Sequence, residues 1–128
     1  MRQIIYIAVA GGMGAVGRYY ITSLAYRLLG DGFPFGTLIV NLIGSFLLGF
    51  LMQANISTNL VPVSLRLPLT LGLLGAFTTF SAFSYETMGY LGDGAWVMAG
   101  SNILVNVLLG ITAAFLGLLL GRTLFGGV

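Results

Sequence analysis

Charged side chains are so sparse along this chain that long stretches of it can be accommodated only in lipid. Five basic and three acidic residues are spread over 128 positions, so 6% of the residues are charged and 58% are hydrophobic. Soluble domains carry roughly 25% charged residues. The sequence therefore predicts an integral membrane protein.

Four apolar stretches, separated by short segments rich in turn-forming residues, organise the chain as one domain of residues 1–128. Each stretch is close to the roughly 20 residues that a helix needs to cross the hydrocarbon core of a bilayer. The predicted fold is an all-α bundle of four transmembrane helices, at about residues 4–29, 35–54, 67–91 and 95–120.

The arginines indicate how these helices are oriented. Four spans place both termini on one side of the membrane, which Arg2, Arg66 and Arg122 share, while Arg27 lies on the other side. The positive-inside rule then favours cytoplasmic termini. The bias is small, so insertion in both orientations is compatible with the sequence.

The residue types that the sequence lacks exclude several chemistries. It contains no cysteine and no histidine, which removes disulfides, thiol chemistry, soft-metal sites and imidazole catalysis. No ATP-binding motif or redox group is evident, so an enzyme is not expected. The formal net charge of +2 is too small and too scattered to predict nucleic-acid binding.

Polar residues recur at helical spacing on three of the four predicted helices. Residues three or four positions apart share one face of a helix. Such stripes can join helices through hydrogen bonds worth roughly 1 kcal/mol each, or they can line a polar path. Their presence on three short helices favours a path. The stripes are Thr37, Asn41 and Ser45; Thr79, Phe83, Glu86 and Tyr90; and Asn102 and Asn106.

The middle of the third stretch has weak helix formers. Gly72 and Gly75 precede the adjacent β-branched residues Thr78 and Thr79, and both types lower helix stability. A break in the helix here would free backbone carbonyls, which a cation, water or facing side chains would have to satisfy. Close packing at a helix crossing explains the glycines equally well.

Four further residues carry charge or aromatic rings where a polar path could use them. Arg18 lies well inside the first span, which ties it to a wet vestibule or an anionic guest unless it forms a structural pair. Glu86 is either a proton carrier or a helix-end residue near water. Phe80 and Phe83 are either lipid contacts or rings whose positive edges favour an anion.

Three segments together resemble the Fluc (CrcB) family of bacterial fluoride channels, and the resemblance covers essentially the whole chain. They are GGMGAVGRYY, which contains Arg18; GTLIVNLIGSFLLG, which contains Asn41; and GLLGAFTTFSAFSYE, which ends at Glu86. The last string, with Thr-Thr-Phe-Ser before a second Phe-Ser and a glutamate, is the most specific of the three.

The resemblance implies an antiparallel, dual-topology homodimer of four-helix subunits with two narrow pores, in which the third helix is broken in mid-membrane. By position, Phe80, Phe83 and Asn41 match residues that line the family's pores. Glu86 matches a glutamate beside the pore, and Arg18 matches the vestibule arginine. Gly75 and Thr78 match the residues whose carbonyls hold a structural Na⁺ between the subunits.

The fourth helix departs from the family pattern. The family's polar track often carries Tyr and Ser, whereas this chain has Asn102, Asn106 and Gly110 at those positions. With Ser81 and Thr79, these asparagines are expected to supply donors that replace the water around fluoride. The implied function is passive export of fluoride from the cytoplasm. The protein is expected to be a multi-pass protein in the lipid bilayer of the cell (inner) membrane.

Two rival functions remain open at this point. A proton-coupled exporter like the small multidrug-resistance transporters also has four short spans, but Glu86 would have to replace the acid that those proteins carry in their first span. A non-transporting assembly subunit would use the polar stripes only to join partners. We also expect the small-residue faces Gly44/Ser45/Gly49 and Gly117/Gly121 to be seams of the dimer.

Overall fold

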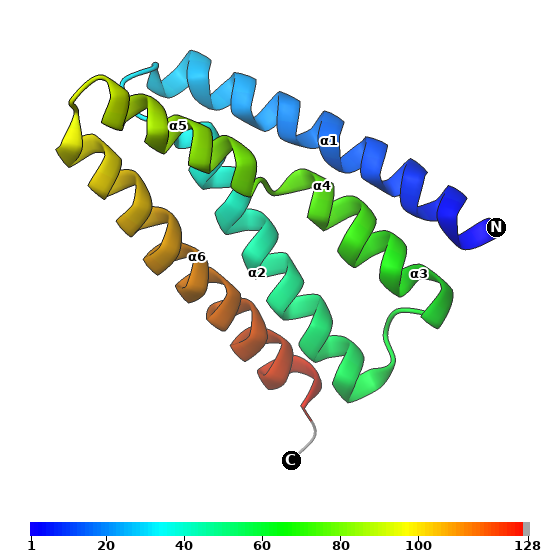
Figure 1. The fold of residues 1–128 in the computed structure, drawn as a ribbon. Helices are drawn as coiled ribbons and strands as arrows, with labels where there is room; N and C mark the ends of the chain where they lie inside the picture. The colour runs from blue at the N-terminus through cyan, green and yellow to red at the C-terminus, as the bar shows by residue number, and fades with distance from the viewer. Residues whose placement is uncertain (127–128) are drawn as a thin grey trace.

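A computed structural model describes residues 1–126, and these residues fold as a bundle of helices (Figure 1). Four helical stretches are long and apolar enough to cross a membrane, namely Arg2–Leu29, Phe35–Thr58, Val63–Gly92 and Trp96–Phe125. The prediction of a multi-pass, all-helical membrane protein is thereby confirmed.

The first, second and fourth stretches are single helices: α1 (Arg2–Leu29), α2 (Phe35–Thr58) and α6 (Trp96–Phe125). The helices run past the predicted spans at several ends. For example, α2 continues through the polar residues after Ala54 as far as Thr58, and Asn59 ends it in the left-handed conformation. Hydrophobicity marks the part of a helix that lies in lipid, whereas capping residues mark where the helix stops.

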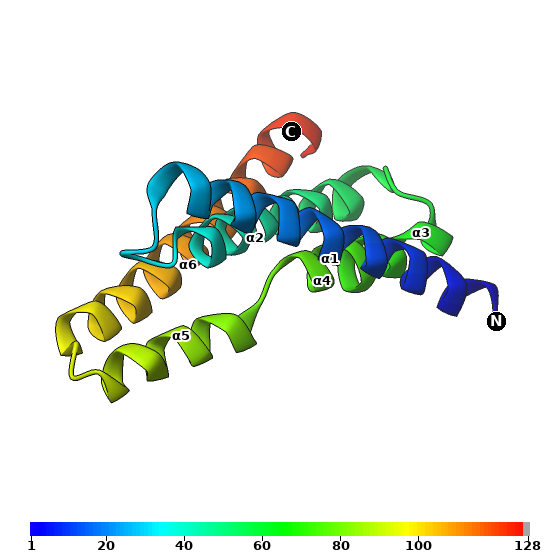
Figure 2. The same ribbon diagram turned by 90° about the horizontal axis from the view of Figure 1, so that it is seen from above.

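The third stretch consists of four pieces: α3 (Val63–Leu67), the wider π-helix η1 (Pro68–Leu74), α4 (Gly75–Phe77) and α5 (Phe80–Gly92). Pro68 begins the π-helix, and a proline inside a helix removes one backbone hydrogen bond. Between α4 and α5, Thr78 (φ −81°, ψ 161°) and Thr79 (φ −151°, ψ 117°) are extended. Figure 2 shows α5 turning away from α4 at this link.

Glycines let α2 and α6 pack along their length with their backbones in close approach. A Cβ atom at Gly117 would lie 2.0 Å from the carbonyl oxygen of Phe46, and one at Gly49 would lie 2.3 Å from that of Ala114. The expectation that these glycines form dimer seams is therefore wrong. Gly49, Gly117 and Gly121 are instead in contact with the facing helix of the same subunit.

On the other side of the bundle, α1 packs against η1 and α4. Gly14 is buried there, and a Cβ atom on it would lie 2.2 Å from the carbonyl oxygen of Leu73. Gly72 approaches α1 in the same way, with a Cβ atom 2.8 Å from the carbonyl oxygen of Ile7. These contacts hold η1 against α1, and α4 also packs on α1, so the extended link begins beside Arg18.

Candidate functional site

Asn41 of α2 holds the extended link in place. Its side-chain Nδ2 donates to the carbonyl oxygen of Thr79 over 3.1 Å, and its Oδ1 accepts from the backbone N–H of Thr79 over 2.8 Å. One amide thus satisfies both backbone groups of a residue that has left the helix. In lipid, where backbone groups find no water, this pairing stabilises a conformation that would otherwise be costly.

Thr79 also starts the next helix. Its Oγ1 accepts from the backbone N–H of Ala82 over 3.1 Å, which makes Thr79 a side-chain N-cap of α5. The consequence is that the carbonyls of residues 75–78 lose their usual helical donors. Gly75 would be paired with the N–H of Thr79, which bonds Asn41 instead, and Thr78 would be paired with the N–H of Ala82.

Arg18 reaches the freed carbonyl of Thr78 from α1. Its Nη1 donates to that oxygen over 3.4 Å, a long hydrogen bond between a guanidinium and a backbone dipole. The predicted membrane arginine is therefore next to the extended link. Its guanidinium places a formal positive charge beside the link, whereas the other groups that bond Thr78 and Thr79 are neutral.

A chain of amides continues from Asn41 to α5. Asn41 Nδ2 donates to Asn106 Oδ1 over 3.3 Å, and Asn106 Nδ2 donates to Asn102 Oδ1 over 2.9 Å. Asn102 Nδ2 in turn donates to Thr87 Oγ1 over 3.0 Å. The two asparagines of α6 thus join α2 to α5 through side chains alone.

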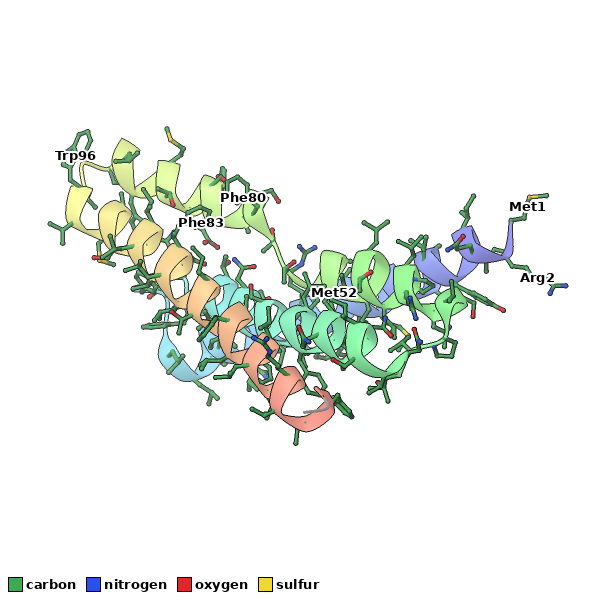
Figure 3. All side chains as sticks on the ribbon, turned by 90° about the horizontal axis from the view of Figure 1, so that it is seen from below. Met1, Arg2, Met52, Phe80, Phe83 and Trp96 are labelled. Carbon is green, nitrogen blue, oxygen red and sulfur yellow. The ribbon has the colours of Figure 1, made fainter. Side chains whose placement is uncertain are left out.

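Beside this chain lies a groove of about 500 Å³ between α2, the third stretch and α6. Its lining contains no charged side chain within residues 1–126, and seven of the predicted site residues belong to it. The rings of Phe80 and Phe83 lie 5.5 Å apart, tilted by 51°, on the first turn of α5 (Figure 3). The seven residues are Asn41, Gly75, Thr78, Thr79, Phe80, Phe83 and Asn106.

Glu86 lies outside that groove and lines a second one, of about 400 Å³, at the end of the bundle where α1 leads into α2. Its Oε1 accepts a hydrogen bond of 2.5 Å from Thr37 Oγ1. Its Oε2 is buried and has no hydrogen-bond partner among the described residues. Asp31 and Asp93 line the same groove, so its lining has three acidic side chains and no basic one within residues 1–126.

Three other predicted pore residues line neither groove. Arg18 contacts the extended link from α1. Ser81 is exposed, and its Oγ is 3.2 Å from Thr79 Oγ1. Asn102 is fully buried within the chain of amides. Thr87 was missed in the sequence. The sequence feature that could have identified Thr87 is its position one helical turn after Phe83, where a hydroxyl could reach the fourth helix.

These features define a class of protein: a small helical membrane protein with an uncharged, mostly apolar groove that holds amides and hydroxyls beside an interrupted helix. The family described as CrcB-like protein, Camphor Resistance (CrcB), matches residues 5–118. The chain therefore belongs to the CrcB family, as its motifs predicted.

Relatives of this chain are similar over almost their full length. A protein of Dehalococcoides mccartyi is 52% identical over 97% of this chain and 95% of its own. A protein of Syntrophotalea carbinolica is 46% identical over 95% and 99%, and one of Geobacter sp. (strain M21) is 44% identical over 97% and 100%. Each is named a fluoride-specific ion channel, which is the name of a channel and not of an enzyme.

Proposed function

We propose that this protein is a fluoride-selective channel that lets fluoride leave the cytoplasm passively and so reduces its toxicity. The observation that carries the proposal is the groove between helices that cross the membrane, which has no charged side chain among residues 1–126 and holds amides, hydroxyls and two phenylalanine rings among its apolar lining residues. The relatives named as fluoride-specific channels support the choice of ion. In a cell with two membranes, the inner one is the expected location.

The mechanism rests on replacing the water that fluoride loses. An unpaired charge in lipid is prohibitively costly, so polar groups along the groove have to accept the ion one after another. Amide hydrogens of Asn41 and Asn106 are the strongest neutral donors there, and the positive edges of Phe80 and Phe83 add weak attraction. Several weak sites allow entry without trapping the ion.

The geometry adds a condition to this mechanism. Both hydrogens of Asn41 are shared between Thr79 and Asn106, and Asn106 Nδ2 contacts two acceptors on Asn102. An amide that coordinates fluoride therefore exchanges a protein acceptor for the ion. Holding the ion leaves that protein acceptor without its donor, a cost that keeps the binding weak and favours release of the ion.

We propose that two copies assemble with opposite orientations in the membrane. The extended link lies near the midpoint of Val63–Gly92, and the groove beside it is open, with Phe80 79% exposed. Open polar backbone at mid-membrane depth has to be covered by protein. A second copy related by an axis in the membrane plane would cover both grooves and form two equivalent paths.

Labelling of a single introduced cysteine tests the orientation, since the chain has no cysteine of its own. Ser64 is exposed at the start of α3 and suits the Ser64→Cys substitution. In vesicles, a membrane-impermeant maleimide should label about half of the chains from outside and the rest only after the vesicles are opened. Labelling of all chains from one side would contradict the opposed arrangement.

The freed carbonyls of Gly75 and Thr78 fit a structural Na⁺ in their chemistry, because they are uncharged oxygens without helical donors. We propose that the carbonyls of both copies hold the ion at the subunit interface, where its charge satisfies them. Arg18 donates to one of these oxygens, so its guanidinium would turn away from an occupied site.

Fluoride efflux from vesicles that contain only the purified protein tests the function. An electrode should record rapid fluoride release with negligible chloride release. Absence of fluoride release together with proton-driven export of a dye would support the exporter that uses Glu86.

The Phe80→Ile substitution tests the third possibility, an assembly subunit. A channel should lose fluoride flux in this variant, whereas an assembly subunit would tolerate the change. Phe115→Ile is the matched control, because Phe115 lies on the exposed surface of α6.

A further inference from the structure

The phenylalanine pair lies between two hydrogen-bonded anchors on one helix. At the start of α5, Thr79 is fixed to Asn41 of α2, and two turns later Thr87 is fixed to Asn102 of α6. Phe80 and Phe83 fall between these points. Figure 1 shows that α5 and α6 lie close together at the turn that joins them and spread apart beyond it.

The second anchor is buried and lies away from the groove. Asn102 is 0% exposed and Thr87 is 7% exposed, and neither lines the groove. The Asn102 amide is bonded at both its nitrogen and its oxygen: Nδ2 donates to Thr87, and Oδ1 accepts from Asn106. Because Asn102 is fully buried and does not line the groove, it would have to leave these partners to contact an ion there.

We propose that Asn102 and Thr87 are positioning residues, which set where α5 lies on α6 and thereby place the Phe80–Phe83 pair beside the groove. Asn106 transmits the same constraint to Asn41, so both ends of the helical segment 79–87 are held by one chain of amides. The effect on conduction rests on the proposed channel function; the effect on α5 does not.

Thr87 offers the cleaner test, because Asn102 has partners on two helices and its removal would disturb both. Thr87→Val keeps the shape of the side chain and removes the acceptor for Asn102, while Thr87→Ser retains a hydroxyl. Thr112→Val is the matched control, because the Thr112 hydroxyl is exposed and bonds only Leu108 of its own helix.

Two readouts separate positioning from other roles. Hydrogen exchange of the backbone amides of α5 in lipid reports how firmly the helix is held, and fluoride efflux from vesicles reports conduction. Thr87→Val should speed exchange in α5 by about threefold to twentyfold, the ratio that corresponds to an interhelical hydrogen bond of roughly 0.6 to 1.7 kcal/mol. It should also slow fluoride efflux, although residue 87 does not line the groove.

The proposal requires Thr87→Ser to restore both readouts and Thr112→Val to leave both at the wild-type level. Exchange in α5 that is unchanged by Thr87→Val would overturn it, whatever happens to efflux. Faster exchange with unchanged efflux would overturn the claim that the anchor serves conduction. If the wild-type protein itself passes no fluoride, the channel proposal fails, and the exchange measurement alone decides whether Thr87 and Asn102 fix α5.

Discussion

Asn41 is the residue at which the second, third and fourth stretches of the bundle meet. It pairs both backbone groups of Thr79 and donates to Asn106, and it also lines the groove. Its amide therefore has two tasks, which are to hold the extended link and to offer a donor to an ion. A substitution that keeps the size of this side chain but changes its charge tests the role of the amide's hydrogen-bond donors without changing the side-chain volume.

We predict that Asn41→Asp lowers fluoride efflux at least about tenfold, equivalent to roughly 1.4 kcal/mol. A carboxylate cannot donate to Thr79, and its negative charge repels an anion beside it in a region of low dielectric. The measurement is the initial rate of fluoride release from vesicles at neutral pH.

Asn55→Asp provides the control, because it makes the same change on the same helix outside the groove. Asn55 Oδ1 accepts from the backbone N–H of Val61, and a carboxylate keeps that acceptor. This variant should release fluoride at the wild-type rate. Equal rates for wild type and Asn41→Asp would show that position 41 has no part in the path.

Helical spacing was sufficient to select most of the residues that the structure gathers at the groove. Asn41 and Asn106 were selected because each belonged to a stripe of polar residues four positions apart. The spacing could not show that their amide hydrogens already bond protein acceptors, nor that Asn102 is buried behind them. Those facts depend on how far apart the helices lie, which a single sequence does not state.

At the scale of elements, the third stretch shows how local chemistry interrupts a helix. Adjacent threonines are poor helix formers, and here one of them caps the following helix while Asn41 pairs its backbone. The weak point at Thr78 and Thr79 could be predicted from the residue types. The π-helix at Pro68–Leu74 was not predicted, although the proline at its first position indicates a change in the backbone hydrogen bonding there.

The tight contact between α2 and α6 yields a stability prediction. Gly117→Ala would place a methyl group 2.0 Å from the carbonyl oxygen of Phe46, so the helices would have to separate. We expect a loss of about 1–3 kcal/mol in the free energy of unfolding, as for other overpacked sites. Unfolding in mixed micelles, followed by helical circular dichroism as denaturing detergent is added, measures it.

Gly100→Ala is the corresponding control on the same helix. A Cβ atom at Gly100 meets nothing within 4 Å, and alanine favours a helix over glycine. This variant should therefore unfold at the same detergent fraction as the wild type, or at a slightly higher one. Equal stability of Gly117→Ala and wild type would mean that α2 and α6 are not packed as closely as described.

For the molecule as a whole, sequence reasoning correctly gave the number of membrane spans but misplaced its glycine faces. Small residues predict close helix packing, yet their spacing is the same whether the partner helix belongs to the same chain or to another. The structure uses Gly49 and Gly117 inside the subunit. Gly44 and Ser45, which belong to one of the predicted faces, line the open groove beside Phe80, and this groove is the candidate for a contact between copies.

The proposed assembly of two copies around a shared cation leads to a prediction about the whole molecule. If the carbonyls of Gly75 and Thr78 hold Na⁺, then sodium stabilises the folded dimer by mass action, by about 2.7 kcal/mol at a concentration 100-fold above its dissociation constant. The thermal unfolding temperature of the purified protein should be higher in sodium chloride than in N-methylglucamine chloride. The same unfolding temperature in both salts would rule out a sodium site that supports the fold.

Passive conduction of fluoride by neutral donors is tested most directly by the voltage at which the current through a protein-containing bilayer is zero. With unequal fluoride on the two sides, that voltage should equal the equilibrium potential of fluoride. It should not move when a chloride or pH gradient is added. A zero-current voltage that follows the proton or chloride gradient would contradict a fluoride-selective channel.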